Sequence, residues 1–538
     1  MELMNHLLFA VALLLPVVSA VDPTVDLGYS KYKGTNLGNG VSQWVGIRYA
    51  APPLKNLRFE LPQEPIRTRT VQDASSYGAA CIATGTDPAA IGSSQSEDCL
   101  FINVWAPAHA TSQDKLPVYF YIQGGGFNSN GNARANGTQL VQTGHLDMVV
   151  VTFNYRVGVY GFLNDGAAVT PNIGLHDQRK GLQWVQRHIS KFGGNPKHVV
   201  IGGDSAGAAS VSLHLSAFGG KNEGLFHGAA AQSVSFGTLL TVKESVYQYK
   251  NLADRLGCSG TNEAILACIR SKSAQEIRAV DANLPLPGGP QPPLYMWTVV
   301  LDNSLVPDVT YRLFEQGRFI QVPLITGDDT NGGTGFAPRN ANTVQQSNDF
   351  LKSQFPFSTT EQLAQLQSLY PNQNDTCPNR GCYWRQISDV YGDMRYMCPG
   401  LYISNSLVSN GVARSWNYRY NVEDPAQVAE GLGVPHVVEN HAIFGPGLTS
   451  SNPPASYLEG QINAPVAPVI QSYWTSFVRS LDPNTHRHPS SVKWEPWTAA
   501  GKQRVVFETG GETRMETPSQ DLQKKCTYIS SIGPSIRQ

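Results

Sequence analysis

One short segment limits the fold of this chain more than any other: KHVVIGGDSAGAASVSLHLS, which starts at Lys197. Its apolar run 198–201 predicts a buried strand, and the residues after Gly207 can form a helix. Between them, the residues GDSAG fit the G-x-S-x-G pattern, which works as a sharp strand–turn–helix elbow. The alternative is an ordinary glycine turn. The strand and helix on either side favour the elbow, with Ser205 as a nucleophile.

Two further apolar runs indicate the type of sheet. Residues 118–122 and 148–153 each end at a glycine or polar turn, as expected of strands covered on both faces. Between the second run and the Ser205 strand, Leu182, Val185 and Ile189 follow helical spacing, and Gly193 ends the helix. Strand, helix, strand is the order of an α/β sheet with mostly parallel strands.

The later sequence fits one large domain. Ile470, Trp474 and Phe477 predict a helix that Pro483 ends. The Pro/Gly-rich segment from Asn283 predicts a loop rather than a linker, because β-like segments resume after it. No internal repeat is present.

Composition and the N-terminus indicate a secreted protein. The chain has 538 residues, and its 40 basic and 41 acidic side chains nearly cancel, which argues against nucleic acid or an anionic membrane as partner. Residues 1–20 contain an apolar run that ends in Val18-Ser19-Ala20, typical of a cleaved signal, although no Lys or Arg precedes it. A buried N-terminal helix is the alternative. We predict a signal peptide at 1–20, one catalytic domain at 21–538 and no membrane anchor.

The cysteines fit the same compartment. Their even number, eight, suits disulfides in an oxidising environment, and the lack of a C-x-x-C pair argues against zinc. Asn136 and Asn374 each begin an Asn-x-Thr sequon and are candidate glycosylation sites. Nothing in the sequence implies a metal or an organic cofactor.

A nucleophile of this kind needs backbone N–H donors for the oxyanion that forms on the attacked carbonyl. Ala206, directly after Ser205, supplies one. The segment QGGGF, from Gln123 to Phe127, follows an earlier predicted strand, as the glycine motif of esterases does. A glycine turn without a ligand is the alternative, and the order of the two motifs argues against it.

Three segments resemble the type-B carboxylesterase and lipase family: SEDCLFINVWAP from Ser96, FGGNPKHVVIGGDSAG from Phe192 and NYRVGVYGFL from Asn154. The resemblance covers essentially the whole chain after the predicted signal and is closest in style to secreted fungal members. It implies the α/β-hydrolase fold, a central mostly parallel sheet flanked by helices, with large loop and helical insertions. It also implies Ser205 as nucleophile and Gly125, Gly126 and Ala206 as oxyanion donors.

The family histidine lies in a motif like G-x-x-H-x-x-E ahead of Phe-Gly, and here GVPHVVENHAIFG supplies His436 and Glu439. The resemblance therefore implies His436 as the general base, with nearby His441 as the second choice. It also implies three disulfides, Cys81–Cys99, Cys258–Cys268 and Cys398–Cys526, which leaves Cys377 with Cys382.

The family acid is missing. Members read acid-Gly-Thr-x-Phe after a strand like VPLITG, and here GGTGF places Gly332 at the acid position. Asp329 or Asp328 is a candidate substitute, although a solvated turn pair is the favoured interpretation of these two. Glu439 is another candidate, but it resembles a structural acid of the family. Otherwise Ser205 and His436 act as a dyad.

These observations predict a secreted serine hydrolase that acts on a small-molecule carboxylic ester or lactone. One alternative is acyl transfer or another biosynthetic reaction in the same pocket. Another is a catalytically weak or silent cholinesterase-like binding protein, against which the retained serine and histidine argue. No Trp lies between Cys81 and Cys99, which argues against choline esters because a cation–π partner is missing there. The sequence leaves the oligomeric state open.

Overall fold

The structure is a computed structural model that describes residues 23–92, 94–372 and 380–538. The predicted signal at 1–20, the sequon at Asn374 and the cysteine at 377 lie outside these residues. No helix in the described ranges has the length and apolar character needed to cross a bilayer.

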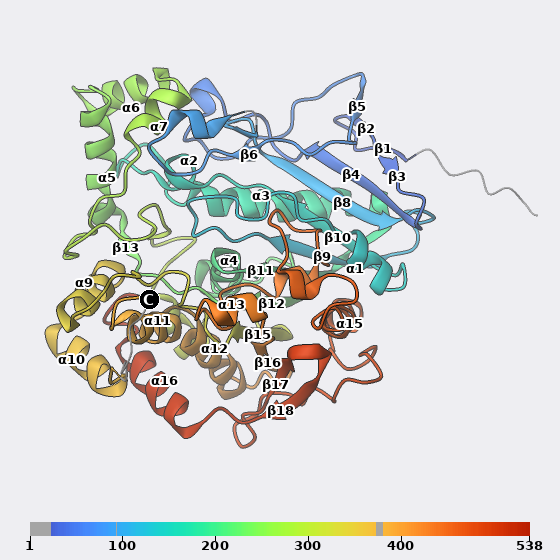
Figure 1. The fold of residues 1–538 in the computed structure, drawn as a ribbon. Coiled ribbons are helices and arrows are strands. Elements are labelled where there is room, and N and C mark those ends of the chain that lie inside the picture. The colour runs from blue at the N-terminus through green and yellow to red at the C-terminus, as the bar shows by residue number, and fades with distance from the viewer. Residues whose placement is uncertain (1–22, 93, 373–379) are drawn as a thin grey trace, which may run out of the picture.

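An eleven-stranded sheet forms the centre of the molecule (Figure 1). From β10 to β17 the neighbouring strands are parallel, and antiparallel strands complete both edges. The spatial order is β18-β17-β16-β15-β12-β11-β9-β10-β8-β4-β3. The bounds are β3 (Thr35–Asn36), β4 (Val41–Arg48), β8 (Phe101–Pro107), β9 (Leu116–Ile122), β10 (Val149–Phe153), β11 (Gly194–Asp204), β12 (Gly228–Gln232), β15 (Leu324–Asp329), β16 (Ser415–Asn421), β17 (Arg504–Glu508) and β18 (Thr513–Glu516).

Short strands outside this sheet form three small ones, β1-β2-β5, β13-β14 and β6-β7. Their bounds are β1 (Thr24–Asp26), β2 (Lys31–Lys33), β5 (Val71–Asp73), β6 (Ala80–Cys81), β7 (Gln95–Ser96), β13 (Leu240–Thr241) and β14 (Val300–Leu301).

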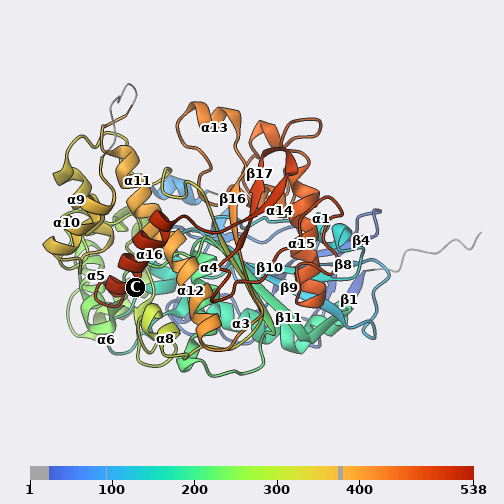
Figure 2. The ribbon, with the colours of Figure 1, turned by 90° about the horizontal axis from the view of Figure 1, so that it is seen from below.

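Helices cover both faces of the central sheet (Figures 1 and 2). The α-helices are α1 (Thr138–Thr143), α2 (Gly158–Phe162), α3 (Ile173–His188), α4 (Ala206–Leu215), α5 (Val242–Arg255), α6 (Asn262–Ser271), α7 (Ala274–Val280), α8 (Thr310–Glu315), α9 (Val344–Gln354), α10 (Thr360–Leu369), α11 (Trp384–Gly392), α12 (Cys398–Ser409), α13 (Pro425–Ala429), α14 (Asn440–Ile443), α15 (Val466–Ser480) and α16 (Gln520–Ile532). A five-residue π-helix, η5 (Asp393–Met397), joins α11 to α12.

The alternation along β9 explains why the sheet is covered twice. Phe120 belongs to one apolar core with Leu182 of α3, whereas Tyr119 belongs to a second core with Trp474 of α15. Successive side chains of a strand point to opposite faces, so an uninterrupted apolar run needs cover on both. The predicted strands and helices around Ser205 are thus confirmed, and α3 passes through a short 3-10 turn to Gly193, whose φ is 84°.

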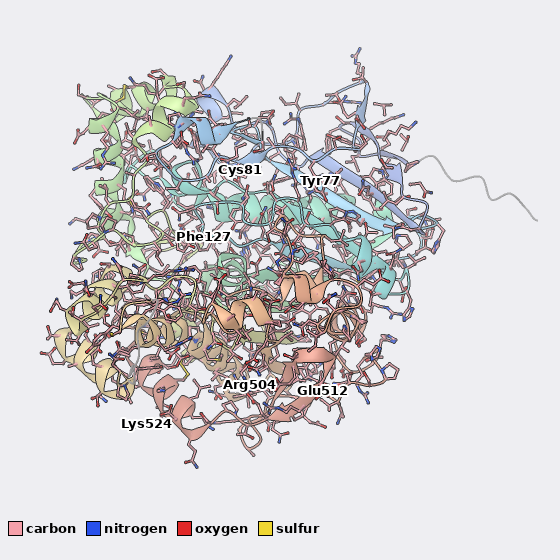
Figure 3. All side chains as sticks on the ribbon, viewed as in Figure 1. Tyr77, Cys81, Phe127, Arg504, Glu512 and Lys524 are labelled. Carbon is pink, nitrogen blue, oxygen red and sulfur yellow. A yellow bond between two sulfur atoms is a disulfide. The ribbon has the colours of Figure 1, made fainter. Side chains whose placement is uncertain are left out.

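Three disulfides close loops within the described ranges: Cys81–Cys99, Cys258–Cys268 and Cys398–Cys526. All three match the predicted pairs. Figure 3 labels Cys81 on the N-terminal side of the molecule and Phe127, which follows the glycine motif, near its centre. The predicted Cys377–Cys382 bond falls outside the described residues because Cys377 does.

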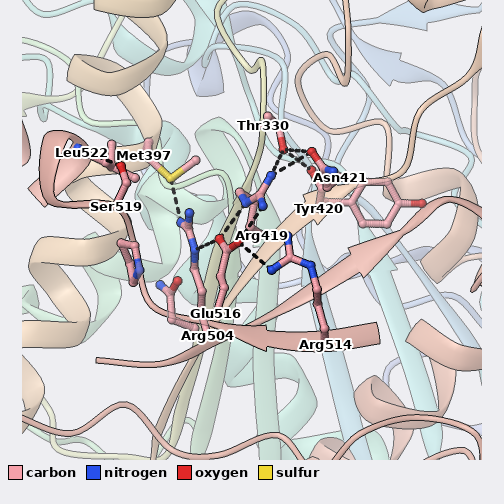
Figure 4. Close-up of polar contacts among 12 residues, drawn as sticks. Thr330, Met397, Arg419, Tyr420, Asn421, Arg504, Arg514, Glu516, Ser519 and Leu522 are labelled. Atoms are coloured by element: carbon pink, nitrogen blue, oxygen red, sulfur yellow. Dashed lines mark hydrogen bonds and ion pairs between the residues drawn. The ribbon is translucent and has the colours of Figure 1, made fainter. Parts of the chain in front are cut away.

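A cluster of charged side chains connects β16, β17 and β18 at one edge of the central sheet (Figure 4). Glu516 accepts hydrogen bonds from Arg419 and Arg504, at 2.6 and 2.8 Å, and forms an ion pair with Arg514 at 3.2 Å. Burial alone would raise the pKa of Glu516, but hydrogen bonding and the charges of Arg419 and Arg504 lower it to about 2. Arg419 also donates to Thr330 Oγ1 (3.0 Å), so this cluster anchors the start of the loop that carries Gly332.

Candidate active site

Ser205 lies on a strained turn between β11 and α4. Its φ and ψ are 54° and −120°, a conformation that non-glycine residues rarely adopt. The Ser205 N–H donates to Gln232 O on the adjacent β12 (2.9 Å), which fixes the turn against the sheet. Helix α4 begins at Ala206, so the first free N–H groups and the positive end of the helix dipole lie next to the serine.

The glycine motif after β9 faces this turn. Gly125 and Gly126 have φ values of 119° and 62°, and their amide groups have no acceptor among the described residues. Buried Asp204 connects the motif to the elbow, because its Oδ1 accepts from Gly124 N (2.9 Å) and from Tyr121 Oη (2.6 Å). Two unpaired loop amides therefore lie close to the start of α4, as an oxyanion site requires.

Ser205 and His436 line the same cavity, which has a volume of about 370 Å³. Gly125, Gly126 and Tyr295 are on its wall, and so is His441, whose Nδ1 lies 3.0 Å from Thr449 Oγ1. The tertiary structure thus brings together two side chains that are 231 positions apart in the chain (436 − 205). This is the arrangement needed for a serine nucleophile and its base.

His436 is held by rings and not by hydrogen bonds. Both ring nitrogens are covered, and neither has a partner within the described ranges. The Tyr396 ring stacks on the imidazole, with centroids 4.1 Å apart, and Phe336 meets it edge-on at 5.3 Å. Burial, and secondarily the charge of Arg395, lower the pKa of His436 to about 3, so the free protein holds a neutral imidazole.

Gly332 lies where a side chain would meet this histidine. A Cβ built on Gly332 would be 3.9 Å from His436 Nδ1 and 3.5 Å from Tyr396 Cδ2, which are ordinary contact distances. The φ of Gly332 is outside the left-handed region, so the backbone accepts other residues. A carboxylate at position 332 would therefore be within reach of Nδ1.

Asp328 and Asp329 are not a solvated turn, and that expectation is wrong. Both lie on β15 and are only 2% exposed, because β15 pairs with β16 as far as Asp329. Burial raises the pKa of Asp328 to about 8, with Arg504 opposing the shift and Glu439 adding to it.

None of the candidate substitute carboxylates bonds to His436. Asp329 Oδ2 accepts from Val437 N (2.7 Å) and Ser233 Oγ (3.1 Å), and Glu439 Oε1 accepts from Tyr418 Oη (3.0 Å). Asp329 and Glu439 face each other; burial and then the Glu439 charge raise the pKa of Asp329 far above its ordinary value. This shift favours the protonated form of Asp329 beneath the His436 loop.

A second cavity of about 200 Å³ lies behind Gly332. Its wall includes Asp389 and Asp393, whose pKa values burial raises to about 6 and about 7. Among the described residues, no group of three or more His, Cys, Asp or Glu side chains is placed to hold a metal ion.

Sequence reasoning missed Tyr295, Arg395 and Tyr396. Tyr295 comes from the Pro/Gly-rich loop, and the other two come from η5. A π-turn has no sequence pattern of its own, although such turns occur frequently at functional sites. The π segment becomes apparent only in the structure, where it draws attention to Arg395 and Tyr396.

Comparison with known proteins identifies the class. The sequence pattern of the Carboxylesterase family matches residues 21–527. The crystal structure of Aspergillus niger EstA superimposes with a TM-score of 0.91 at 41% identity, covering 96% of this chain and 99% of EstA. Secreted lipase 4 of Gibberella zeae is 30% identical over 91% of this chain and 90% of its own length. Lipase 1 of Geotrichum candidum is 30% identical over 91% of this chain and 92% of its own length.

The chain has the α/β-hydrolase fold. It belongs to the carboxylesterase family, in the type-B carboxylesterase and lipase group.

Proposed function

We propose that the protein is a secreted serine hydrolase that cleaves a carboxylic ester or lactone with Ser205 as nucleophile and His436 as base. The observation that carries this proposal is the single cavity that Ser205, His436, Gly125 and Gly126 line together. The names of the relatives, an esterase and secreted lipases, support both the reaction class and the secretion.

In this mechanism the neutral imidazole of His436 takes the Ser205 proton as Oγ attacks the carbonyl carbon. The amides of Gly125, Gly126 and Ala206 receive the oxyanion. The same imidazole then returns the proton to the leaving alcohol, and a water molecule repeats the sequence to release the acid. For a lactone, the leaving hydroxyl stays in the same product molecule.

Without a triad acid the imidazolium intermediate lacks its usual counter-charge. In another serine hydrolase, loss of that acid lowers kcat by about 10⁴-fold, which corresponds to about 5.5 kcal/mol. The lowered pKa of His436 fits this picture, because the cation is costly in a buried site with Arg395 nearby. We therefore propose slow turnover of simple esters and better turnover of activated ones.

A second candidate is acyl transfer to an alcohol in the same cavity. The cavity of about 370 Å³ leaves room for an alcohol beside an acyl group on Ser205. An acceptor alcohol bound in the cavity would then compete well with water for the acyl-enzyme.

The test of the nucleophile is labelling with a fluorophosphonate followed by peptide mass mapping. Ser205→Ala should remove both the label and ester turnover, with an unchanged melting temperature. Ser531→Ala, at an exposed serine on α16, is the matched control and should keep both. An adduct on another serine would refute the assignment, and product analysis with added alcohols separates hydrolysis from transfer.

A further inference from the structure

Arg395 is a half-buried cation that has no counter-ion in the part of the chain that the structure describes. Its Nε donates to Ser235 Oγ (2.8 Å), and the guanidinium lies directly against Gly237, where a side chain would collide with it. Among the described residues, neither Nη group has a hydrogen-bond or ion-pair partner, and neither is enclosed. Two donors of a planar fork are therefore free to bind.

Three of the buried arginines of this chain are paired with carboxylates, whereas buried Arg278 donates to the backbone carbonyl oxygens of Ala83 and Asp87. Arg58 binds Glu97 at 2.6 Å, Arg156 binds Asp177 at 2.7 Å, and Arg504 binds Glu516 at 2.8 Å. Removing a guanidinium from water is costly unless an anion compensates for it. An unpaired arginine in such a position is therefore a candidate anion-binding group.

Arg395 is connected to both proposed catalytic residues through its neighbours. Ser205 N bonds to Gln232 O, and the chain continues from Gln232 directly to the 233–237 loop, on which the guanidinium rests. On its other side, the following residue, Tyr396, stacks on His436. The charge of Arg395 also acts on Tyr295, which lines the Ser205 cavity.

From this placement we infer that Arg395 binds a carboxylate elsewhere in the substrate, so that the substrate class is an acid-bearing ester or lactone. The assignment of Arg395 to a substrate site rests on the proposed function. An Arg–carboxylate pair is bidentate and charge-assisted, which gives it both strength and orientation.

The same pairing would compensate in part for the missing triad acid. Among the described residues, Arg395 is the charged group that opposes protonation of His436, and a bound carboxylate would offset that opposition. The substrate would then bring with it the negative charge that position 332 lacks. Neutral esters would bind beside an uncompensated cation and react more slowly.

The first experiment measures binding without turnover, by isothermal titration of the Ser205→Ala protein. The probes are two matched pairs: phenyl hydrogen glutarate and phenyl glutaramate, and 4-butyryloxybutanoate and its amide. We expect at least one acid to bind about tenfold more tightly than its neutral amide. In a Ser205→Ala, Arg395→Gln double variant this ratio should fall to about one, whereas Arg395→Lys should keep part of it.

Arg385→Gln is the matched control, because it removes a cation from the neighbouring α11 without acting on His436, and it should leave the ratio unchanged. If Arg395→Gln fails to fold, the test is the salt dependence of the acid-to-amide affinity ratio, measured on the Ser205→Ala protein that retains Arg395. The acid preference should fall as NaCl rises from 50 to about 500 mM, because an ion pair is screened. Equal binding of acid and amide, or a preference that survives Arg395→Gln or high salt, would overturn the inference.

Turnover of the same esters by the protein with Ser205 distinguishes the two proposals. Hydrolysis with no preference for the acid supports the proposed function and overturns this inference. Tight, Arg395-dependent binding of the acid, without turnover or fluorophosphonate labelling, would overturn the proposed function. The site would then bind carboxylates without catalysing a reaction.

Discussion

Tyr396 lies face to face with His436, with ring centroids 4.1 Å apart and planes 27° from parallel. The same Tyr396 ring is the nearest neighbour of the space next to Gly332, at 3.5 Å from a Cβ placed there. The ring thus restricts rotation of the imidazole at the point where a carboxylate would otherwise hold it. The face of an aromatic ring also attracts a cation, by about 0.5–2 kcal/mol. This is much less than a triad acid contributes.

Tyr396→Leu should therefore lower kcat for an activated ester by about tenfold, about 1.4 kcal/mol, with little change in KM. Tyr396→Phe should stay within about threefold, because the ring face remains. The effect of Tyr396→Leu should shrink when Gly332→Glu is present, since the two groups orient the same histidine. A role for the ring face would be contradicted if Tyr396→Leu lowered kcat equally with and without Gly332→Glu. It would also be contradicted if Tyr396→Phe lowered kcat as much as Tyr396→Leu does.

Gly332→Glu should raise turnover of small activated esters by about tenfold or more. The new carboxylate would be within reach of Nδ1, and the backbone accepts a side chain at this position. Gly335→Glu is the matched control on the same loop, where a Cβ meets nothing within 4 Å, and should give no gain. Steady-state kinetics on 4-nitrophenyl acetate measures both. No gain in a folded protein whose Ser205 is still labelled would refute the view that position 332 faces the histidine productively.

Asp329→Asn should change kcat/KM by less than about threefold. The amide oxygen can still accept from Val437 N, and the amide N–H can replace the proton that the raised pKa of Asp329 favours. Asp329→Ala should lose more, because it leaves Val437 N and Ser233 Oγ without their acceptor. If Asp329→Asn costs 100-fold or more at an unchanged melting temperature, Asp329 acts as an ionised substitute acid.

Asp328→Asn should change how stability depends on pH. Burial raises the pKa of Asp328 from 3.8 to about 8, so between these values the folded protein holds a proton that the unfolded chain has released. The contribution of this group to stability is therefore complete below about pH 4 and is lost as the pH rises towards 8. We expect the melting temperature of the variant, relative to the unmodified protein, to rise between pH 5 and pH 8.

The control for this measurement is Asp114→Asn at an exposed loop aspartate, which should show no such trend. A constant difference between Asp328→Asn and the unmodified protein at both pH values would mean that Asp328 is ionised in the folded protein as well.

Local sequence was sufficient for the elbow and its supporting elements. The apolar runs that became β9, β10 and β11, and the helical spacing in α3 and α15, report burial on a fixed period. The conformation of Ser205 follows from its immediate neighbours, since GDSAG sits between a strand and a helix. Family motifs supplied His436 and three disulfide pairs that local spacing alone does not determine.

Tertiary structure decided what surrounds the histidine. The two aspartates after Gly327 are turn-forming residues in isolation, but pairing with Arg419 and Tyr420 on β16 extends the strand over them and buries them. Tyr396 reaches His436 only because η5 packs against a loop 40 positions later in the chain (436 − 396). Such contacts depend on long-range packing, which has no period or motif in the sequence. The sequence by itself therefore determined the elbow at Ser205 and the sheet that carries it, and packing alone determined which groups surround His436.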